Sequence, residues 1–234
     1  MGQEVYFTRD KKMNQLGLPI SLNSSMLLEN FVANKELLRL INQLFEGQIS
    51  SELYIYGLSG NGKTHALQGA VLKSLENDKN AVFIDCSDSI PEHLVDLMDQ
   101  IKLMSFDNVH LIARENEEIF FDLFNRARQS EITILVSGDC LPSDLDVMKD
   151  IKTRLSLTAV YKLEELNDEQ TMSVIDKQMS ERNMSVESKV YEYLFKNYSR
   201  DLKLLLSTMD DLDKASLETK KPISVPFVRN HLGL

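Results

Sequence analysis

Hydrophobic residues recur in short runs along the first two-thirds of the chain, and amphipathic stretches separate these runs. The apolar runs have the length and composition of buried strands. They lie at residues 53–56, 81–84, 103–106, 132–136 and 160–163. The stretches around them have the spacing of helices and lie at 35–45, 65–75, 91–98, 116–129 and about 143–155. This alternation predicts an α/β fold with a parallel five-stranded sheet that helices cover on both faces.

The pattern becomes wholly helical after residue 167. Helical spacing runs through 168–182, 187–197 and 201–217, and Pro226 begins a last short helix. The first 30 residues, in contrast, are polar with scattered leucines and show no sustained period. We therefore predict a flexible arm at 1–30, an α/β domain at 31–165 and a small all-helical domain at 166–234.

A complete G-x-x-x-x-G-K-T motif stands between the first predicted strand and the helix that follows it. Its candidate phosphate-binding residues are Gly57, Ser59, Gly60, Asn61, Gly62, Lys63 and Thr64. The glycines let the loop turn its N–H groups toward an anion, and the next helix adds its positive end. Lys63 is suited to the outer phosphates and Thr64 to magnesium. The motif thus predicts a nucleoside triphosphate or diphosphate with Mg²⁺; a simple glycine turn is the weaker alternative.

Polar residues follow two of the predicted strands, where parallel sheets bind ligands. Asp107 ends the third run and is a candidate to hold magnesium through water, as in a Walker B motif, or it caps a turn. The next residue, Asn108, cannot accept a proton, so we expect slow intrinsic hydrolysis and retention of bound diphosphate. Asp139 follows the fourth run and either senses the outer phosphate and positions water or belongs to an ordinary Gly-Asp turn.

Composition narrows the class of protein. The chain has 36 acidic and 26 basic residues and a net charge of −10, which argues against direct binding to nucleic acid. Two cysteines, Cys86 and Cys140, are too few for a disulfide framework or a zinc cluster, and both read as buried thiols in a reducing compartment. Since neither a membrane-spanning apolar stretch nor a signal core is present, we expect a cytoplasmic protein without membrane attachment.

Several motifs together resemble the AAA+ ATPases, and more narrowly the bacterial replication initiator DnaA. The sequence NFVAN at 30–34 resembles the entry segment of DnaA, GKTH at 62–65 its P-loop, and DN at 107–108 with FFDLFN at 120–125 its Walker B region. DnaA would continue into a helix-turn-helix domain, whereas this sequence ends shortly after PISVPFV at 222–228. That pattern is similar to the Hda family, short DnaA homologues that mediate regulatory inactivation of DnaA.

The resemblance implies further site residues. Phe31, Val32 and His65 would lie beside the nucleotide, and the cofactor would be ADP or ATP with magnesium. Arg154 matches the family's arginine finger, presented in trans to the ATP of a neighbouring DnaA, and Arg200 matches the sensor 2 arginine of the helical lid. One departure is that the best-known Hda has Arg and Ser where this chain keeps Lys63 and Thr64. We therefore expect its P-loop to bind nucleotide more as the P-loop of DnaA does.

The arm carries a short motif that resembles the clamp-binding peptide of Hda. Its candidate contact residues are Gln15, Leu16, Leu18, Pro19 and Ile20. Gln15 would satisfy polar groups at a pocket rim while the apolar residues anchor an extended segment. The alternative is an arm that packs on its own domain.

The resemblance implies an ADP-bound AAA+ protein, associated with the sliding clamp, that stimulates hydrolysis of DnaA-bound ATP and has weak ATPase activity itself. It would be a negative regulator of replication initiation and reach DNA only through the clamp. Two alternatives are a self-sufficient ATPase, such as a helicase loader, and a non-catalytic replication scaffold. Whether the chain forms a homodimer, and whether it prefers ADP or ATP, stays open.

Overall fold

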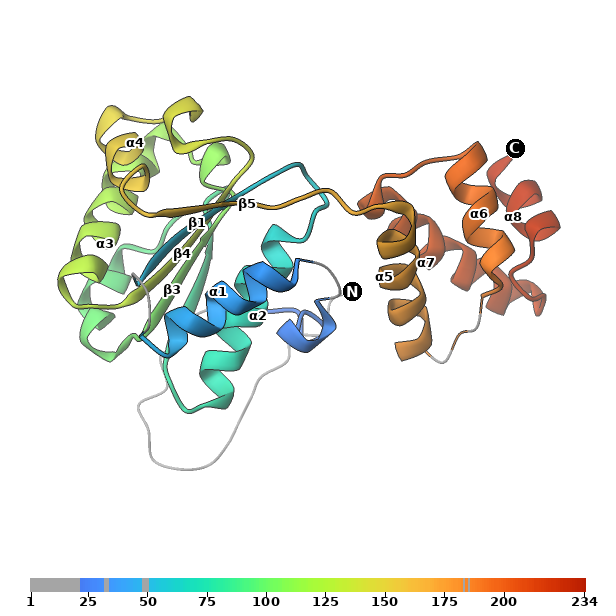
Figure 1. Cartoon of the computed structure of the whole chain (residues 1–234), viewed down its shortest axis with the longest axis horizontal. Helices are drawn as coiled ribbons and strands as arrows, with labels where there is room; N and C mark the ends of the chain where they lie inside the picture. Colours follow the sequence, from blue (N-terminus) through green and yellow to red (C-terminus); the bar gives the residue numbers. More distant parts are fainter. Residues whose placement is uncertain (1–21, 32–33, 48–50, 183, 185) are drawn as a thin grey trace.

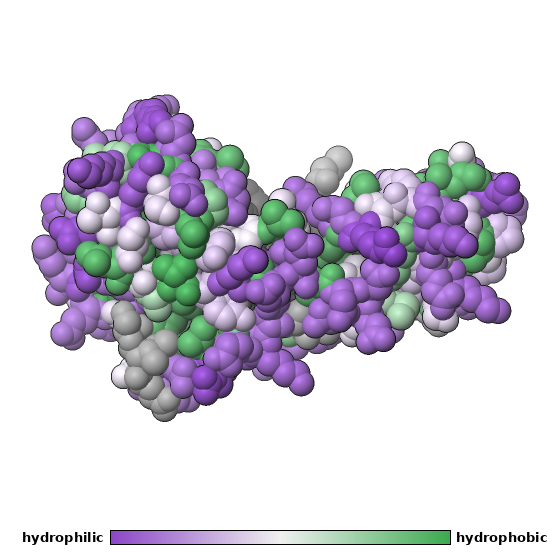
Figure 2. All heavy atoms as spheres, turned by 45° about the horizontal axis from the view of Figure 1, so that its top comes forward, coloured by the Kyte–Doolittle hydropathy of each residue, from purple (hydrophilic) through white to green (hydrophobic). Residues whose placement is uncertain are grey.

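The computed structural model describes residues 22–31, 34–47, 51–182, 184 and 186–234. Figure 1 shows two lobes joined by the segment that leaves strand β5: one is built on a sheet, and the other is wholly helical. On the face drawn in Figure 2, small hydrophobic groups lie among hydrophilic side chains. In the part of the chain that the structure describes, no helix is long and apolar enough to cross a membrane.

Five parallel strands form the sheet, as the sequence predicts. They are β1 (Glu52–Tyr56), β2 (Ala81–Asp85), β3 (Leu103–Asp107), β4 (Thr133–Gly138) and β5 (Ala159–Lys162). Their order across the sheet is β2-β3-β4-β1-β5. Three strands, β2, β3 and β4, continue past the predicted apolar runs into polar residues. Asp85 of β2, for example, is the strand-register neighbour of Asp107 of β3. The carboxyl ends of β2, β3 and β4 therefore bring polar side chains to one edge of the sheet.

Alternate residues of the strands face two separate cores. On β1, Leu53 and Ile55 join the core beneath α1 (Lys35–Phe45) and α2 (Lys63–Glu76), whereas Tyr54 joins the opposite core. That second core includes residues of α3 (Glu117–Gln129) and α4 (Lys149–Leu155). Helices thus cover both faces, as Figure 1 shows.

Two predicted helices differ from the structure. The stretch predicted at 91–98 is a 3-10 helix, η2 (Glu92–Gln100), which begins after Pro91. The stretch 143–155 divides into a short 3-10 helix, η5 (Pro142–Asp144), and α4. Between them the chain bends at residues 145–147, where Leu145 and Val147 are buried and Asp146 is exposed. Short 3-10 helices also occur at Leu28–Asn30, Val109–Leu111 and Arg114–Asn116.

The helical lobe has a core of its own. Its helices are α5 (Asp168–Glu181), α6 (Ser188–Asn197), α7 (Leu202–Thr219) and α8 (Val225–Leu232). A capping box begins α5, in which the Asn167 side chain accepts from the Gln170 N–H and the Gln170 side chain accepts from the Asn167 N–H. The inward residues include Ile175, Leu194, Leu205 and Met209, all fully buried. This lobe therefore has the apolar packing of a small helical domain.

Candidate functional site

The P-loop connects β1 to α2. Gly60 and Gly62 have φ angles of 85° and 95°, a region that favours glycine. At Gly57 a Cβ atom would lie 2.8 Å from the carbonyl oxygen of Leu163, just after β5. Glycine is therefore required at three positions for two reasons: backbone conformation at 60 and 62, and close packing at 57.

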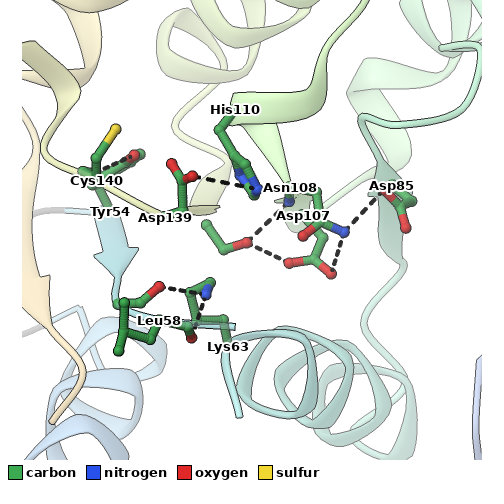
Figure 3. Close-up of polar contacts among 11 residues, drawn as sticks. Tyr54, Leu58, Lys63, Asp85, Asp107, Asn108, His110, Asp139 and Cys140 are labelled. Carbon is green, nitrogen blue, oxygen red and sulfur yellow. Dashed lines mark hydrogen bonds and ion pairs between the residues drawn. The ribbon is translucent and has the colours of Figure 1, made fainter. Parts of the chain in front are cut away.

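Lys63 is the first residue of α2 and is buried. Its Nζ donates to the carbonyl oxygens of Gly57 at 2.6 Å and Leu58 at 2.9 Å (Figure 3). Burial lowers the pKa of Lys63, while the negative charges of Asp107 and Asp139 act in the opposite direction. An ammonium group has three donors, so one N–H remains for an anionic oxygen.

Thr64 and Asp107 are in direct contact. Thr64 Oγ1 donates to Asp107 Oδ2 at 2.7 Å, and the Ser137 hydroxyl donates to the other carboxylate oxygen. Asp107 is fully buried, and burial raises its pKa; Asp85 adds to the rise, and the hydrogen bonds from Ser137 and Thr64 oppose it. A hydroxyl and a carboxylate are oxygen donors of the kind that Mg²⁺ prefers. The two residues predicted to serve magnesium therefore form a pair that suits it.

Asn108 lies between two carboxylates. Its Nδ2 donates to Asp85 Oδ1 at 3.1 Å and to Asp107 Oδ2 at 3.3 Å, and its backbone N–H donates to Ser137 Oγ. Asp85 and Ser137 were not predicted as site residues. Both occur at the ends of strands on the same edge as Asp107, which is the signal that could have indicated them.

Asp139 comes directly after β4 and is half-exposed. His110 Nε2 lies 3.9 Å from its Oδ2, and the two side chains point toward one another in Figure 3. Its charge also acts on Lys63. Asp139 is therefore close enough to the P-loop lysine to act on its charge, which suits a residue near the outer phosphate, and His110 is a neighbour that the sequence did not indicate.

Phe31 and His65 lie against the P-loop. A Cβ atom on Gly62 would stand 3.0 Å from the Phe31 ring, and the rings of Phe31 and His65 meet edge to face with centroids 5.4 Å apart. Nδ2 of Asn61 is buried and has no hydrogen-bond partner among the described residues. Glycines, an ammonium, an oxygen pair and an unpaired amide donor together suit a nucleotide phosphate and magnesium. The predicted contact Val32 lies outside the described residues.

The two predicted arginines lie elsewhere. Arg154 is near the end of α4, with its guanidinium carbon 6.0 Å from the centre of the Phe121 ring, and its side chain makes no ion pair or hydrogen bond to a described residue. Arg200 is paired with Asp168 inside the helical lobe, at 2.9 Å. The neighbouring Asp201 lies near the P-loop, 3.9 Å from where a Cβ on Gly60 would stand. The structure thus brings the start of α7 to the P-loop but turns Arg200 toward Asp168.

The predicted clamp-binding residues Gln15, Leu16, Leu18, Pro19 and Ile20 lie outside the described residues. The described chain begins at residue 22 and lies along α2. Asn23 N–H donates to Gln68 Oε1 at 3.0 Å, and His65 Nε2 is 2.8 Å from the carbonyl oxygen of Leu27. Lys177 of α5 also donates to the carbonyl oxygen of Glu29. Residues 22–31 therefore touch both the P-loop helix and the helical lobe.

Solved structures share this architecture. Domain III of the Thermotoga maritima replication initiation protein DnaA superposes with a TM-score of 0.75 at 21% identity, covering 90% of this chain and 96% of that one. AMPPCP-bound DnaA from Aquifex aeolicus gives 0.69 at 21% identity, with 83% of this chain and 67% of that one covered. The Thermotoga maritima RuvB branch migration motor gives 0.65 at 12% identity, with coverage of 88% and 70%. At these identities the likeness concerns the fold, which is that of an AAA+ module followed by a lid.

Sequence comparisons are more specific. A model of the bacterial DnaA ATPase domain matches residues 22–162, and a model of the Hda lid domain matches residues 168–232. An uncharacterised protein of Haemophilus influenzae is 33% identical over 231 residues, covering 94% of this chain and 99% of that protein. The first model alone spans more than half of the chain. The chain therefore belongs to the DnaA family of AAA+ proteins and carries a lid domain of the Hda type.

Proposed function

We propose that this protein is a negative regulator of replication initiation that promotes hydrolysis of ATP bound to DnaA. In this proposal it holds ADP or ATP at its P-loop, associates with the sliding clamp and presents Arg154 to the nucleotide of a neighbouring DnaA. The observation that carries the proposal is the position of Arg154. It stands on α4, which packs in the core opposite α2, and its side chain is joined to no described partner by an ion pair or hydrogen bond.

The nucleotide part of the proposal is supported by the contacts around Lys63 and Asp107. Lys63 would hold the outer phosphates, and Thr64 with Asp107 would hold magnesium, which would offset the negative charge of the phosphates. The DnaA structures that share the fold include two solved with AMPPCP. Phe31 and His65, which touch at the P-loop, are the proposed neighbours of the base.

Low intrinsic turnover is part of the same proposal. A residue that activates water must be free to accept a proton or to face the water. The Asn108 amide donates to Asp85 and Asp107 instead, and an amide cannot take up a proton. This arrangement disfavours the self-sufficient ATPase. A guanidinium supplied across an interface, in contrast, contributes about 10³ to 10⁵ in rate in systems that use one.

The proposed association with the sliding clamp rests on a motif that resembles a clamp-binding peptide. Its residues are Gln15, Leu16, Leu18, Pro19 and Ile20. It is tested by binding of the purified protein to the clamp. Replacing Gln15 and Leu16 by alanine should abolish that binding and leave nucleotide affinity unchanged. Equal clamp binding by the intact and the substituted protein would refute this part of the proposal.

The central experiment measures hydrolysis of DnaA-bound ATP in the presence of DNA-loaded clamp. The intact protein should raise the rate, and Arg154→Ala should remove the increase. Arg39→Ala is the matched control, because Arg39 is an exposed arginine of α1 whose side chain pairs, among the described residues, only with Glu36. Full stimulation by Arg154→Ala would support a scaffold without catalysis, and turnover by the isolated protein without any effect on DnaA would support an ATPase that acts alone.

A further inference from the structure

A buried carboxylate outside the nucleotide site joins α4 to α3. Glu117 is the first residue of α3, and 5% of its surface is exposed. Its Oε2 accepts from the backbone N–H of Met148 at 2.9 Å, and its Oε1 accepts from Arg114 Nη1 at 2.7 Å. Met148 directly precedes α4, and its own side chain does not cap the helix. Glu117 therefore holds the backbone at the start of α4.

Arg114 contacts the loop before α4 at a second residue. Its Nη2 donates to Asp146 Oδ1 at 2.8 Å, two residues before Met148. Arg114 and Asp146 are both exposed, so their ion pair is weak in water. The contact from Glu117 to Met148 involves a buried, charged acceptor and is therefore the stronger of the two.

The far end of α4 also rests on α3. Phe121, over whose ring the guanidinium of Arg154 lies, stands one helical turn after Glu117. Ile151, between the two attachments, and Leu155, the last residue of α4, are fully buried. At about 1.5 Å per residue, Arg154 stands roughly 9 Å along the helix from Met148. A shift at the start of so short a helix is carried directly to the guanidinium.

We propose that Glu117 is a positioning residue for Arg154. By accepting the N–H of Met148 it fixes α4 where Arg154 can reach the triphosphate of a neighbouring molecule; Glu117 touches no phosphate itself. The inference rests on the proposed function. A guanidinium stabilises developing charge only at hydrogen-bonding distance, and a misplacement of about 1 Å can cost on the order of 100-fold in rate.

Two substitutions separate this role from general stability. Glu117→Gln keeps an oxygen that can accept from Met148, whereas Glu117→Met keeps the length and removes the acceptor. Glu52→Gln is the matched control: Glu52 is equally buried and is paired with Arg128 at 2.7 Å, at the start of β1. The readout is stimulated DnaA hydrolysis as a function of protein concentration.

Glu117→Met should lower the maximal stimulated rate by about tenfold and leave the half-saturating concentration unchanged. Glu117→Gln should stay within about twofold of the intact protein, and Glu52→Gln should keep the full maximal rate even if it melts earlier. A normal maximal rate for Glu117→Met, or an equal loss for Glu52→Gln, would overturn the proposal.

Hydrogen exchange gives a readout that needs no DnaA. Amides of residues 149–155 should exchange at least about tenfold faster in Glu117→Met, but not in Glu117→Gln or Glu52→Gln. Unchanged exchange in Glu117→Met would overturn the claim that Glu117 holds α4. If the intact protein fails to stimulate DnaA, the proposed function falls together with the role of Arg154, and the exchange experiment still decides whether Glu117 holds the helix.

Discussion

Arg200 and Asp168 form a two-point ion pair within the lid: Arg200 Nε lies 2.9 Å from Asp168 Oδ1, and Nη2 lies 3.2 Å from Oδ2. Both side chains are largely exposed. If Arg200 serves the nucleotide as a sensor arginine, it must leave this carboxylate. The ion pair therefore competes with phosphate for the same guanidinium.

Asp168→Asn should consequently tighten nucleotide binding. Because an ion pair this exposed is weak in water, we expect a gain in affinity of no more than about fivefold. Titration with a fluorescent ADP analogue measures the change. Asp211→Asn, which removes the partner of Lys214 on the same lid, is the control and should have no effect. Unchanged affinity in Asp168→Asn, with a loss in Arg200→Ala, would show that the pair does not compete.

His65 makes stability depend on pH. Burial lowers its pKa below the ordinary 6.5, so the folded ring is neutral at pH values where the unfolded chain takes up a proton. The free energy of unfolding should be highest above pH 6.5 and fall below it, by up to about 1.4 kcal/mol per pH unit. Glu181 and the Leu27 carbonyl oppose the shift, and Lys177 adds to it.

Urea unfolding at pH 7.5, 6.5 and 5.5 checks this prediction. His65→Gln retains an N–H that can donate to Leu27 but does not titrate, so its stability should fall less steeply over the same range. Parallel curves for the two proteins would show that another group causes the pH dependence.

Asn108→Asp should destabilise the protein. It would place a third carboxylate beside Asp85 and Asp107, where the Asn108 amide now donates to both. The loss should be about 1–3 kcal/mol, measured by thermal melting in the absence of divalent ions. Asp85→Asn in the same chain should restore most of it, because it removes one of the three charges. A wild-type melting temperature for Asn108→Asp would contradict this account.

Gly69→Ala tests the packing of residues 22–31 on α2. Alanine favours a helix interior over glycine by about 1 kcal/mol. Here, however, its Cβ would lie 2.8 Å from the carbonyl oxygen of Met26 and 2.9 Å from Leu28. We expect a net loss of about 1–3 kcal/mol, which Leu28→Ala should partly relieve in the double variant. A gain in stability would mean that this segment is not held against α2.

The sequence predicted the sheet and the P-loop well because both have short-range signals. Apolar runs indicated each strand, and the glycine spacing indicated the loop around Lys63. The strand ends were set too early at Asp85 and Asp107, since hydrogen bonding of the ladder continues where hydrophobicity stops. Cys140, two residues after β4, is half-buried rather than buried, whereas Cys86 is buried as predicted.

Long-range pairings carried no local signal. That Asn108 would donate to Asp85, or that Glu117 would accept from the Met148 N–H, depends on which strands and helices become neighbours. For Arg200, the family resemblance implies a nucleotide contact, and in this structure its side chain is paired with a carboxylate 32 positions away in the chain. Such contacts require the tertiary structure.

The segment 22–31 has a mechanical consequence. It is hydrogen-bonded to α2 through Gln68 and His65 and to the lid through Lys177, so it contacts the α/β lobe and the helical lobe at once. If a partner binds the chain before this segment and pulls on it, the force would act on the P-loop helix and on α5. We therefore expect residues 22–31 to link the nucleotide pocket mechanically to the lid.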